Sequence, residues 1–198
     1  MNLVKLFFCD VETTGLDPAR NGITQIAGEI GYLRPDGSYD TKTAFNFNCA
    51  PFGQDMVEKS ALDIQKKTAE EVSAYPLPGE IFKKLKTIIE KHVEKYEPTD
   101  KLFFVAYNSP FDNSFMREFW RKNGDKYFGG LFWTPDLCVM RLAAEKLKFN
   151  RDTFPNFKLQ TVAAALDVKI EGGGEFHDAS YDIALTRDIY LKLIGTNQ

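Results

Sequence analysis

The sequence predicts an α/β fold in which a mixed β-sheet is flanked by helices, with residues 1–198 forming one domain. Residues 3–9 are apolar and rich in aromatic side chains, which is typical of a buried central strand. Two strand-like segments with a turn signal between them follow, and helical periodicity then alternates with short apolar runs. A meander followed by this alternation indicates a mixed sheet covered by helices.

The first part of the chain is expected to form the meander. Residues 13–18 have the composition of a turn, and residues 23–33 are the second predicted strand. Pro-Asp-Gly at residues 35–37 is a hairpin signal, and residues 42–48 alternate well enough for a third strand.

The rest of the chain is expected to supply the helices and the remaining strands. Residues 50–78 give a mixed signal, with a short helix expected within 56–67. Pro78 begins a helix with apolar residues at i, i+3 and i+4 spacing, and residues 97–100 end it. The further predictions are a strand at 102–106, a helix at 111–122, a strand at 131–134, a helix at 135–147, a loop at 150–155, and helices at 159–166 and 179–194.

Composition and charge narrow the class of protein. The chain is 43% hydrophobic and 27% charged, which is typical of a soluble globular protein rather than a disordered one. Proteins that grip long stretches of duplex are usually basic, because they must neutralise many phosphates. The net charge here is -3, so a nucleic-acid partner is expected to be held mainly at a local site.

The three cysteines and the N-terminus exclude other classes. Cys9, Cys49 and Cys138 are far apart and form no CxxC pair, which argues against a zinc site or a disulfide framework. There is no signal-peptide pattern and no apolar run of membrane-spanning length, so a cytoplasmic protein with reduced thiols is expected. His92 lies in a lysine-rich segment and is predicted to be a surface residue.

An acidic pair follows the first predicted strand. Side chains alternate between the faces of a strand, so Asp10 and Glu12 point the same way. Two adjacent carboxylates repel unless a cation lies between them, and hard divalent cations prefer oxygen ligands. Such triplets are common and weak evidence alone, but the buried strand before this pair makes solvation a poor explanation for it.

Three more residues have settings that suit the same chemistry. Asp112 begins a predicted helix after an apolar run, where a helix N-cap or first-turn acid is the alternative. His177 and Asp182 suit one site if the histidine lies in the loop before the last helix and the acid in its second turn. Glycines at 172–174 favour that loop. Taken singly, His177 is better explained as a surface loop residue, and a solvated helix acid is an equally plausible explanation for Asp182.

The five residues also lie in motifs that resemble a known family. The runs FCDVETTGL at residues 8–16, VAYNSPFDNSFM at 105–116 and HDASYD at 177–182 resemble, in order and spacing, the three exonuclease motifs of the DnaQ-like superfamily in its histidine-containing (DEDDh) form. The resemblance spans almost the whole chain. It implies a ribonuclease H-like fold, with a five-stranded mixed sheet whose second strand is antiparallel.

The resemblance implies a metal-dependent 3′→5′ exonuclease that releases 5′-mononucleotides. Asp10, Glu12, Asp112 and Asp182 would hold two divalent cations, Mg²⁺ or Mn²⁺, with Asp10 bridging them. His177 would be the general base, a role that suits a pKa near neutrality.

The resemblance also implies residues that contact the substrate. Thr13 would hydrogen-bond the terminal 3′-hydroxyl, Leu16 would wedge against the terminal base, and Phe111 would stack on a base. Core packing is the alternative for Leu16 and Phe111. Asn108 matches the family as well, with shaping of the turn as its alternative.

Some features depart from the family pattern or leave the substrate open. The second motif often has a histidine where this chain has Tyr107, a position that is not a metal ligand. Proofreading subunits of the replicative polymerase usually continue into a polymerase-binding tail, and the chain ends at Gln198, which weakens that assignment. Residues 113–116 and the longer segment at 50–78 favour RNase T-like members, which act as dimers on RNA and DNA ends.

The partners expected are single-stranded 3′ ends of DNA or RNA, with a polymerase or a second copy as possible protein partners and no membrane. An oligoribonuclease-like enzyme is an alternative. So is an inactive binding subunit with an exonuclease fold. The intact acids argue against the inactive subunit, because nothing else offsets the cost of clustering like charges.

Overall fold

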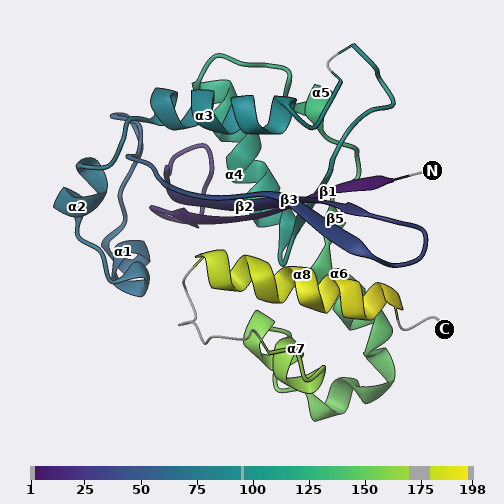
Figure 1. Ribbon diagram of the computed structural model, residues 1–198. Coiled ribbons are helices and arrows are strands. Elements are labelled where there is room, and N and C mark those ends of the chain that lie inside the picture. The colour runs from purple at the N-terminus through teal and green to yellow at the C-terminus, as the bar shows by residue number, and fades with distance from the viewer. Residues whose placement is uncertain (1–2, 95, 170–178, 196–198) are drawn as a thin grey trace.

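The centre of the computed structural model is one five-stranded sheet in the order β3-β2-β1-β4-β5 (Figure 1). The structure describes residues 3–94, 96–169 and 179–195. The strands are β1 (Val4–Thr13), β2 (Ile23–Leu33), β3 (Tyr39–Asn48), β4 (Phe103–Ala106) and β5 (Leu137–Cys138). β2 is antiparallel to both β1 and β3, whereas β1, β4 and β5 are parallel. The predicted mixed sheet with an antiparallel second strand is therefore confirmed.

Helices cover both faces of the sheet. They are α1 (Lys59–Gln65), α2 (Ala69–Ser73), α3 (Pro78–Glu90), α4 (Ser109–Lys122), α5 (Phe128–Leu131), α6 (Val139–Lys146), α7 (Leu159–Ala165) and α8 (Ala179–Gly195), with a 3₁₀ segment η1 (Lys148–Thr153). In Figure 1, α3, α4 and α5 lie on one side of the sheet and α6, α7 and α8 on the other, while α1 and α2 lie beyond one end.

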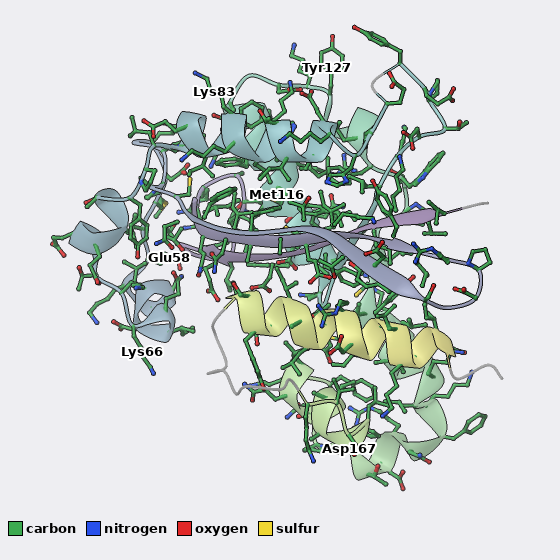
Figure 2. All side chains as sticks on the ribbon, in the orientation of Figure 1. Glu58, Lys66, Lys83, Met116, Tyr127 and Asp167 are labelled. Carbon is green, nitrogen blue, oxygen red and sulfur yellow. The ribbon has the colours of Figure 1, made fainter. Side chains whose placement is uncertain are left out.

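Strand alternation divides the core into two parts. Phe7, Cys9 and Val11 of β1 pack with α3 and α4, and Leu6 and Phe8 pack with α6, α7 and α8. Met116 of α4 lies in the interior between α3 and the sheet, whereas Tyr127 points away from the molecule (Figure 2). Both faces of β1 are buried, which agrees with its nearly continuous apolar sequence.

The last strand differs from the prediction. Residues 131–134, which were expected to form a strand, are not one of the five strands, although Phe132 makes an isolated parallel bridge to Leu102. The expected helix at 135–147 begins only at Val139, because Leu137 and Cys138 pair with β4 as β5. A two-residue strand carries no periodicity of its own, so its pairing with β4 overrides the helical pattern that follows it.

His92 was predicted to be a surface residue, and this is wrong. α3 ends at Glu90, well before residue 97, and His92 is half-buried against the β2–β3 hairpin. Its Nδ1 lies 2.9 Å from the Tyr32 hydroxyl and its Nε2 lies 3.0 Å from the Thr43 hydroxyl. Two hydroxyls from strands distant in sequence thus offset the cost of burying the ring.

Smaller differences concern boundaries and local structure. β1 extends to Thr13 and β3 begins at Tyr39, α2 was not predicted, and η1 occupies much of the expected 150–155 loop. Cys9, Cys49 and Cys138 are all free thiols. No helix in the ranges that the structure describes is long and apolar enough to cross a lipid bilayer.

Candidate active site

Asp10 and Glu12 lie in the carboxyl-terminal half of β1. Both continue the face of Leu6 and Phe8, which α8 covers. In the antiparallel register with β2, Asp10 is opposite Ala27 and Glu12 is opposite Gln25. The structure therefore places the two carboxylates side by side on one face, near the carboxyl end of β1. Proteins with open α/β sheets form their binding sites at the carboxyl ends of the strands.

Asp112 reaches the same strand from α4. β1 pairs with β4 only over Leu6–Phe8, so the next part of its edge has no strand partner there. The backbone N–H of Val11 instead donates to Asp112 Oδ1 at 3.2 Å. The N-cap of α4 is Asn108, so Asp112 is a buried first-turn residue rather than the N-cap. This bond holds the Asp112 carboxylate at Val11, which is the residue between Asp10 and Glu12.

Asp182 comes from α8 on the covered face. It lies in the first turn of the helix, not in the second turn as expected. The side chain is half-buried, and its charge acts on both Asp10 and Glu12. His177 and the glycines at 172–174 lie outside the described residues.

Burial and mutual repulsion dominate the electrostatics of these acids. Burial, followed by the charges of Asp112, Glu12 and Asp182, raises the pKa of Asp10 well above its ordinary value. Burial and then the charge of Asp182 raise the pKa of Glu12 to about 7. Burial also raises the pKa of Asp112 to about 7, although the N–H of Val11 lowers it in part. Among the described residues that shift the pKa of Asp10 or Glu12, none is a cation.

The donor set fits hard divalent cations. In the part of the chain that the structure describes, no three acidic, histidine or cysteine side chains are already gathered as a ligand cage. Repulsion between like charges opposes closer approach of the carboxylates before a cation binds. The charges of Asp112, Glu12 and Asp182 nevertheless act on Asp10. Four carboxylates are an all-oxygen set of the kind that Mg²⁺ or Mn²⁺ prefers.

A loop at residues 14–22 follows β1 and is fixed by the segment at 55–58. The Thr14 hydroxyl donates to the Met56 carbonyl at 2.5 Å, and the Glu58 N–H donates to the Thr14 carbonyl at 2.8 Å. A β-carbon on Gly15 would lie 2.3 Å from Asn21 Nδ2, so only glycine fits this approach. Glu58 stands close to α1, beyond the end of the sheet (Figure 2). The loop is therefore a fixed part of the site.

Two of the residues expected to contact substrate differ sharply in burial. Leu16 is 80% exposed at the outside of the 14–22 loop, so it is not a core residue. Phe111 is half-buried, and its ring centroid lies 4.9 Å from that of Phe115. Leu16 is thus available to a ligand over most of its surface, whereas Phe111 is only partly accessible.

Thr13 and Asn108, the other two residues expected to contact substrate, differ in which of their polar groups are already hydrogen-bonded. The Thr13 hydroxyl donates to the Gly15 carbonyl at 2.7 Å, and the Thr13 carbonyl accepts from Gln65 Nε2 at 2.7 Å. The hydroxyl oxygen can still accept a hydrogen bond. Asn108 is exposed at the N-cap of α4 and makes no side-chain cap bond, while its carbonyl accepts from Phe111 N–H at 2.9 Å.

Sequence reasoning missed two apolar residues beside this loop. Met56 is 46% exposed and Val57 is 41% exposed. Met56 N–H donates to the Arg20 carbonyl at 2.7 Å, which holds this pair next to the loop of Leu16. The signal in the sequence was an apolar pair between Asp55 and Glu58, within the segment of mixed periodicity.

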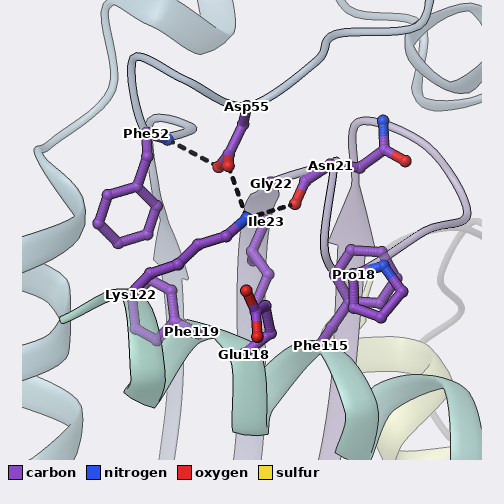
Figure 3. Close-up of a pocket in the computed structure, with 10 residues that line it drawn as sticks. All are labelled: Pro18, Asn21, Gly22, Ile23, Phe52, Asp55, Phe115, Glu118, Phe119 and Lys122. Carbon is purple, nitrogen blue, oxygen red and sulfur yellow. Dashed lines mark hydrogen bonds and ion pairs between the residues drawn. The ribbon is translucent and has the colours of Figure 1, made fainter. Parts of the chain in front are cut away.

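A buried ion pair joins the loop to α4. Figure 3 shows Lys122 reaching from α4 to Asp55 and to the carbonyl of Asn21. Lys122 Nζ lies 2.6 Å from Asp55 Oδ1 and 3.0 Å from the Asn21 oxygen, and the two charged side chains are 6% and 1% exposed. Phe52 N–H donates to the other Asp55 oxygen at 2.9 Å. The cavity beside them is about 10 Å³, room for about one water molecule, so this is a structural contact and not a ligand site.

Replacing Lys122 with methionine is therefore expected to destabilise the protein by about 3–5 kcal/mol, because Asp55 would remain buried without its partner. Urea denaturation of the wild type and the variant measures this difference. The double variant K122M/D55N removes both charges and is expected to recover part of the loss. A single variant as stable as the wild type would contradict the role given to this pair.

Comparison with known proteins decides the family. A family model described as an exonuclease matches residues 7–190, from β1 to α8. The matched range contains Asp10, Glu12, Asp112 and Asp182. The chain belongs to this exonuclease family. The resemblance to DnaQ-like exonucleases is thus confirmed, and the protein is a nuclease by family.

Relatives of this exonuclease support the same family. The DNA polymerase III subunit epsilon of Rickettsia conorii (strain ATCC VR-613 / Malish 7) is 28% identical over 201 residues, which cover 100% of this chain and 77% of that protein. A structure of exonuclease I has a TM-score of 0.72 at 21% identity, over 98% of this chain and 41% of that one. E. coli exonuclease I in complex with a dT13 oligonucleotide has a TM-score of 0.73 at 20% identity, over 98% of this chain and 42% of that one. At these identities the likeness to exonuclease I shows the shared fold, and this chain spans about two fifths of its length.

Proposed function

We propose that this exonuclease hydrolyses phosphodiester bonds at the 3′ end of single-stranded nucleic acid and releases 5′-mononucleotides with the help of divalent cations. The observation that carries the proposal is the group of four acids at the end of β1. They come from three elements, and burial together with the charges of neighbouring acids raises the pKa of Asp10, of Glu12 and of Asp112. Clustered carboxylates cost stability, and bound cations offset that cost.

Asp10, Glu12, Asp112 and Asp182 would hold two cations, Mg²⁺ or Mn²⁺, and the charges of the other three acids all act on Asp10. When bound, the ions supply positive charge at the scissile phosphate and favour ionisation of water. Val11 N–H holds the Asp112 carboxylate in place through the bond at 3.2 Å. We assign the proton acceptor to His177, whose imidazole suits proton transfer near neutral pH.

The surroundings of the acids support recognition of a free strand end. Leu16, Met56 and Val57 present exposed apolar side chains on the loop and segment that follow β1. An unpaired terminal base has an apolar face that such side chains can cover. The Thr13 hydroxyl oxygen can accept a hydrogen bond from a terminal 3′-hydroxyl, since its own proton is given to Gly15.

Single-stranded DNA is the first substrate to test. E. coli exonuclease I, which shares this fold, forms complexes with dT13 and dA16 oligonucleotides. The net charge of -3 favours a local grip on a strand end over a long contact with duplex. RNA of the same length is the second arm, since the described site has no feature that discriminates the sugars.

A second candidate role is proofreading in the cytoplasm beside a polymerase. The observation that favours it is the relative from Rickettsia conorii, a DNA polymerase III subunit that matches this chain along its whole length. Faster release from a duplex with a mismatched 3′ end than from a matched one would support this role.

The experiment is a time course with a 5′-labelled oligonucleotide and Mg²⁺ or Mn²⁺. The proposed function requires a ladder that shortens one nucleotide at a time from the 3′ end, with 5′-mononucleotide as product. Chelation with EDTA should stop the reaction, and added metal should restore it. Internal cuts in the earliest samples, or no mononucleotide with either metal, would reject the proposal.

Leu16→Ala is expected to weaken binding of the strand end and to leave stability almost unchanged. Loss of about 1 kcal/mol of apolar contact raises the KM by about fivefold. The free energy of unfolding should change by less than about 0.5 kcal/mol, because the side chain is 80% exposed. Steady-state kinetics and urea denaturation measure the two effects. Ile64→Ala, which shortens another exposed apolar side chain, on α1, is the control.

A further inference from the structure

Three polar side chains connect β2, β3 and the start of α8. Gln25 Nε2 donates to Asn46 Oδ1 at 2.8 Å, and Asn46 Nδ2 donates to Ser180 Oγ at 2.8 Å. Gln25 is on β2, Asn46 is on the edge strand β3, and Ser180 is in the first turn of α8. The chain of amides therefore joins the sheet to the helix that carries Asp182.

The register places this connection in line with the carboxylates of β1. Glu12 is opposite Gln25, and Asp10 is opposite Ala27, which in turn is opposite Asn46. Side chains of directly opposite residues lie on one face of a sheet, so Asn46 shares the face of Asp10. Ala27, between them, is small and fully buried in the same core cluster as Ala179, where α8 begins.

Helix geometry relates Ser180 to Asp182. A helix turns about 100° per residue, so these two side chains point about 200° apart around the axis of α8. Ala179 and Ile183 are buried in the core against the sheet. Ser180 faces the edge strand β3, as its bond to Asn46 shows, so Asp182 on the opposite side of the helix is turned toward β1, against which α8 packs. The bond between Asn46 and Ser180 thus fixes the rotation of α8 about its axis, and this rotation sets the direction of the Asp182 side chain.

We propose that Asn46, held by Gln25, is a positioning residue that locks the first turn of α8 so that Asp182 stays aimed at Asp10 and Glu12. This inference rests on the proposed function. Repulsion between the acids opposes their approach before a cation binds, and the bond from Asn46 to Ser180 opposes that repulsion. The connection prepares the cation site, because part of the ordering is complete before binding.

The test is cation affinity without nucleic acid, measured by calorimetry with Mn²⁺ on the whole chain. Asn46→Ala and Ser180→Ala are each expected to weaken Mn²⁺ binding by about three- to tenfold, the worth of one neutral hydrogen bond. The double variant should be no weaker than either single variant, because both remove the same bond. Ser180→Thr keeps the hydroxyl and should bind as the wild type does.

Kinetics separate positioning from substrate contact. Asn46→Ala should need about three- to tenfold more Mn²⁺ for half-maximal rate, with the KM for the oligonucleotide unchanged. Asn48→Ala is the matched control: it is an exposed asparagine two residues along the same strand face, and no side-chain bond to it is found within the described residues. It should stay within about twofold of the wild type in both assays.

Several results would overturn the inference. They are wild-type Mn²⁺ affinity in Asn46→Ala, additive losses in the double variant, or an equal rise in KM for the changes at Asn46 and Asn48, which would mean that the amides bind substrate. Circular dichroism verifies folding, and Ser180→Ala on the exposed side of α8 replaces any variant of Asn46 that does not fold. An active wild type with an insensitive Asn46 rejects this inference alone. A wild type that binds no Mn²⁺ and releases no mononucleotide rejects the proposed function and this inference with it.

Discussion

Replacing Asp10 with asparagine is expected to lower the rate of mononucleotide release by about a thousandfold. Asp10 is the acid on which the charges of Asp112, Glu12 and Asp182 all act, so its carboxylate is the centre of the proposed cation site. Asparagine keeps the volume and removes the charge. If cation binding supplies about 4 kcal/mol of transition-state stabilisation, its loss corresponds to that factor. Shortening of the 5′-labelled oligonucleotide at saturating Mg²⁺ measures the rate.

The same variant is expected to be more stable than the wild type when no metal is present, because one of the repelling charges is gone. A loss of activity together with a rise in the melting temperature would separate a functional defect from a folding defect. Asp63→Asn, an exposed acid on α1, is the control and should keep its rate within about twofold. Retention of more than about a tenth of the activity by the Asp10 variant would remove Asp10 from the centre of the site.

The metal-free protein is expected to lose stability as the pH rises from about 4.5 to about 7. Burial and the charge of Asp182 raise the pKa of Glu12 from 4.5 to about 7 in the folded state. Below about pH 4.5 Glu12 is protonated in both the folded and unfolded states, and above about pH 7 it is ionised in both. Between these values only the folded state keeps the proton, so the free energy of unfolding falls, by about 3 kcal/mol for Glu12 alone. Asp112 acts in the same direction over a similar range.

Urea denaturation in EDTA at several pH values measures this fall. Mg²⁺ should restore the lost stability, and its effect should be larger at pH 8 than at pH 5, because cations bind the ionised carboxylates. In Glu12→Gln the slope over this window should become shallower. A metal-free protein whose stability is level between pH 5 and pH 8 would show that the acids do not repel one another as the structure indicates.

The order of the strands shows how far local pattern predicts this fold. The meander of β1, β2 and β3 follows from runs of apolar residues and from the hairpin signal at 35–37, which are local properties. β5 did not follow, since two residues are too few for a pattern and their strand character arises from pairing with Val105 and Ala106. His92 was misplaced for a similar reason, since its partners Tyr32 and Thr43 are more than 45 residues away in the chain.

The candidate site divides in the same way. Strand alternation alone put Asp10 and Glu12 on one face, and local settings together with the motifs singled out Asp112, Asp182 and His177. The sequence by itself thus determined the family, and it was enough to propose the chemical type of the site and its acids, because these depend on residue identity and spacing. Only the tertiary structure decided that Asp112 bonds to Val11, that Leu16 is exposed and that Asn46 contacts Ser180. The physical reason is that burial and hydrogen bonding between distant segments depend on how the chain packs, which no local pattern records.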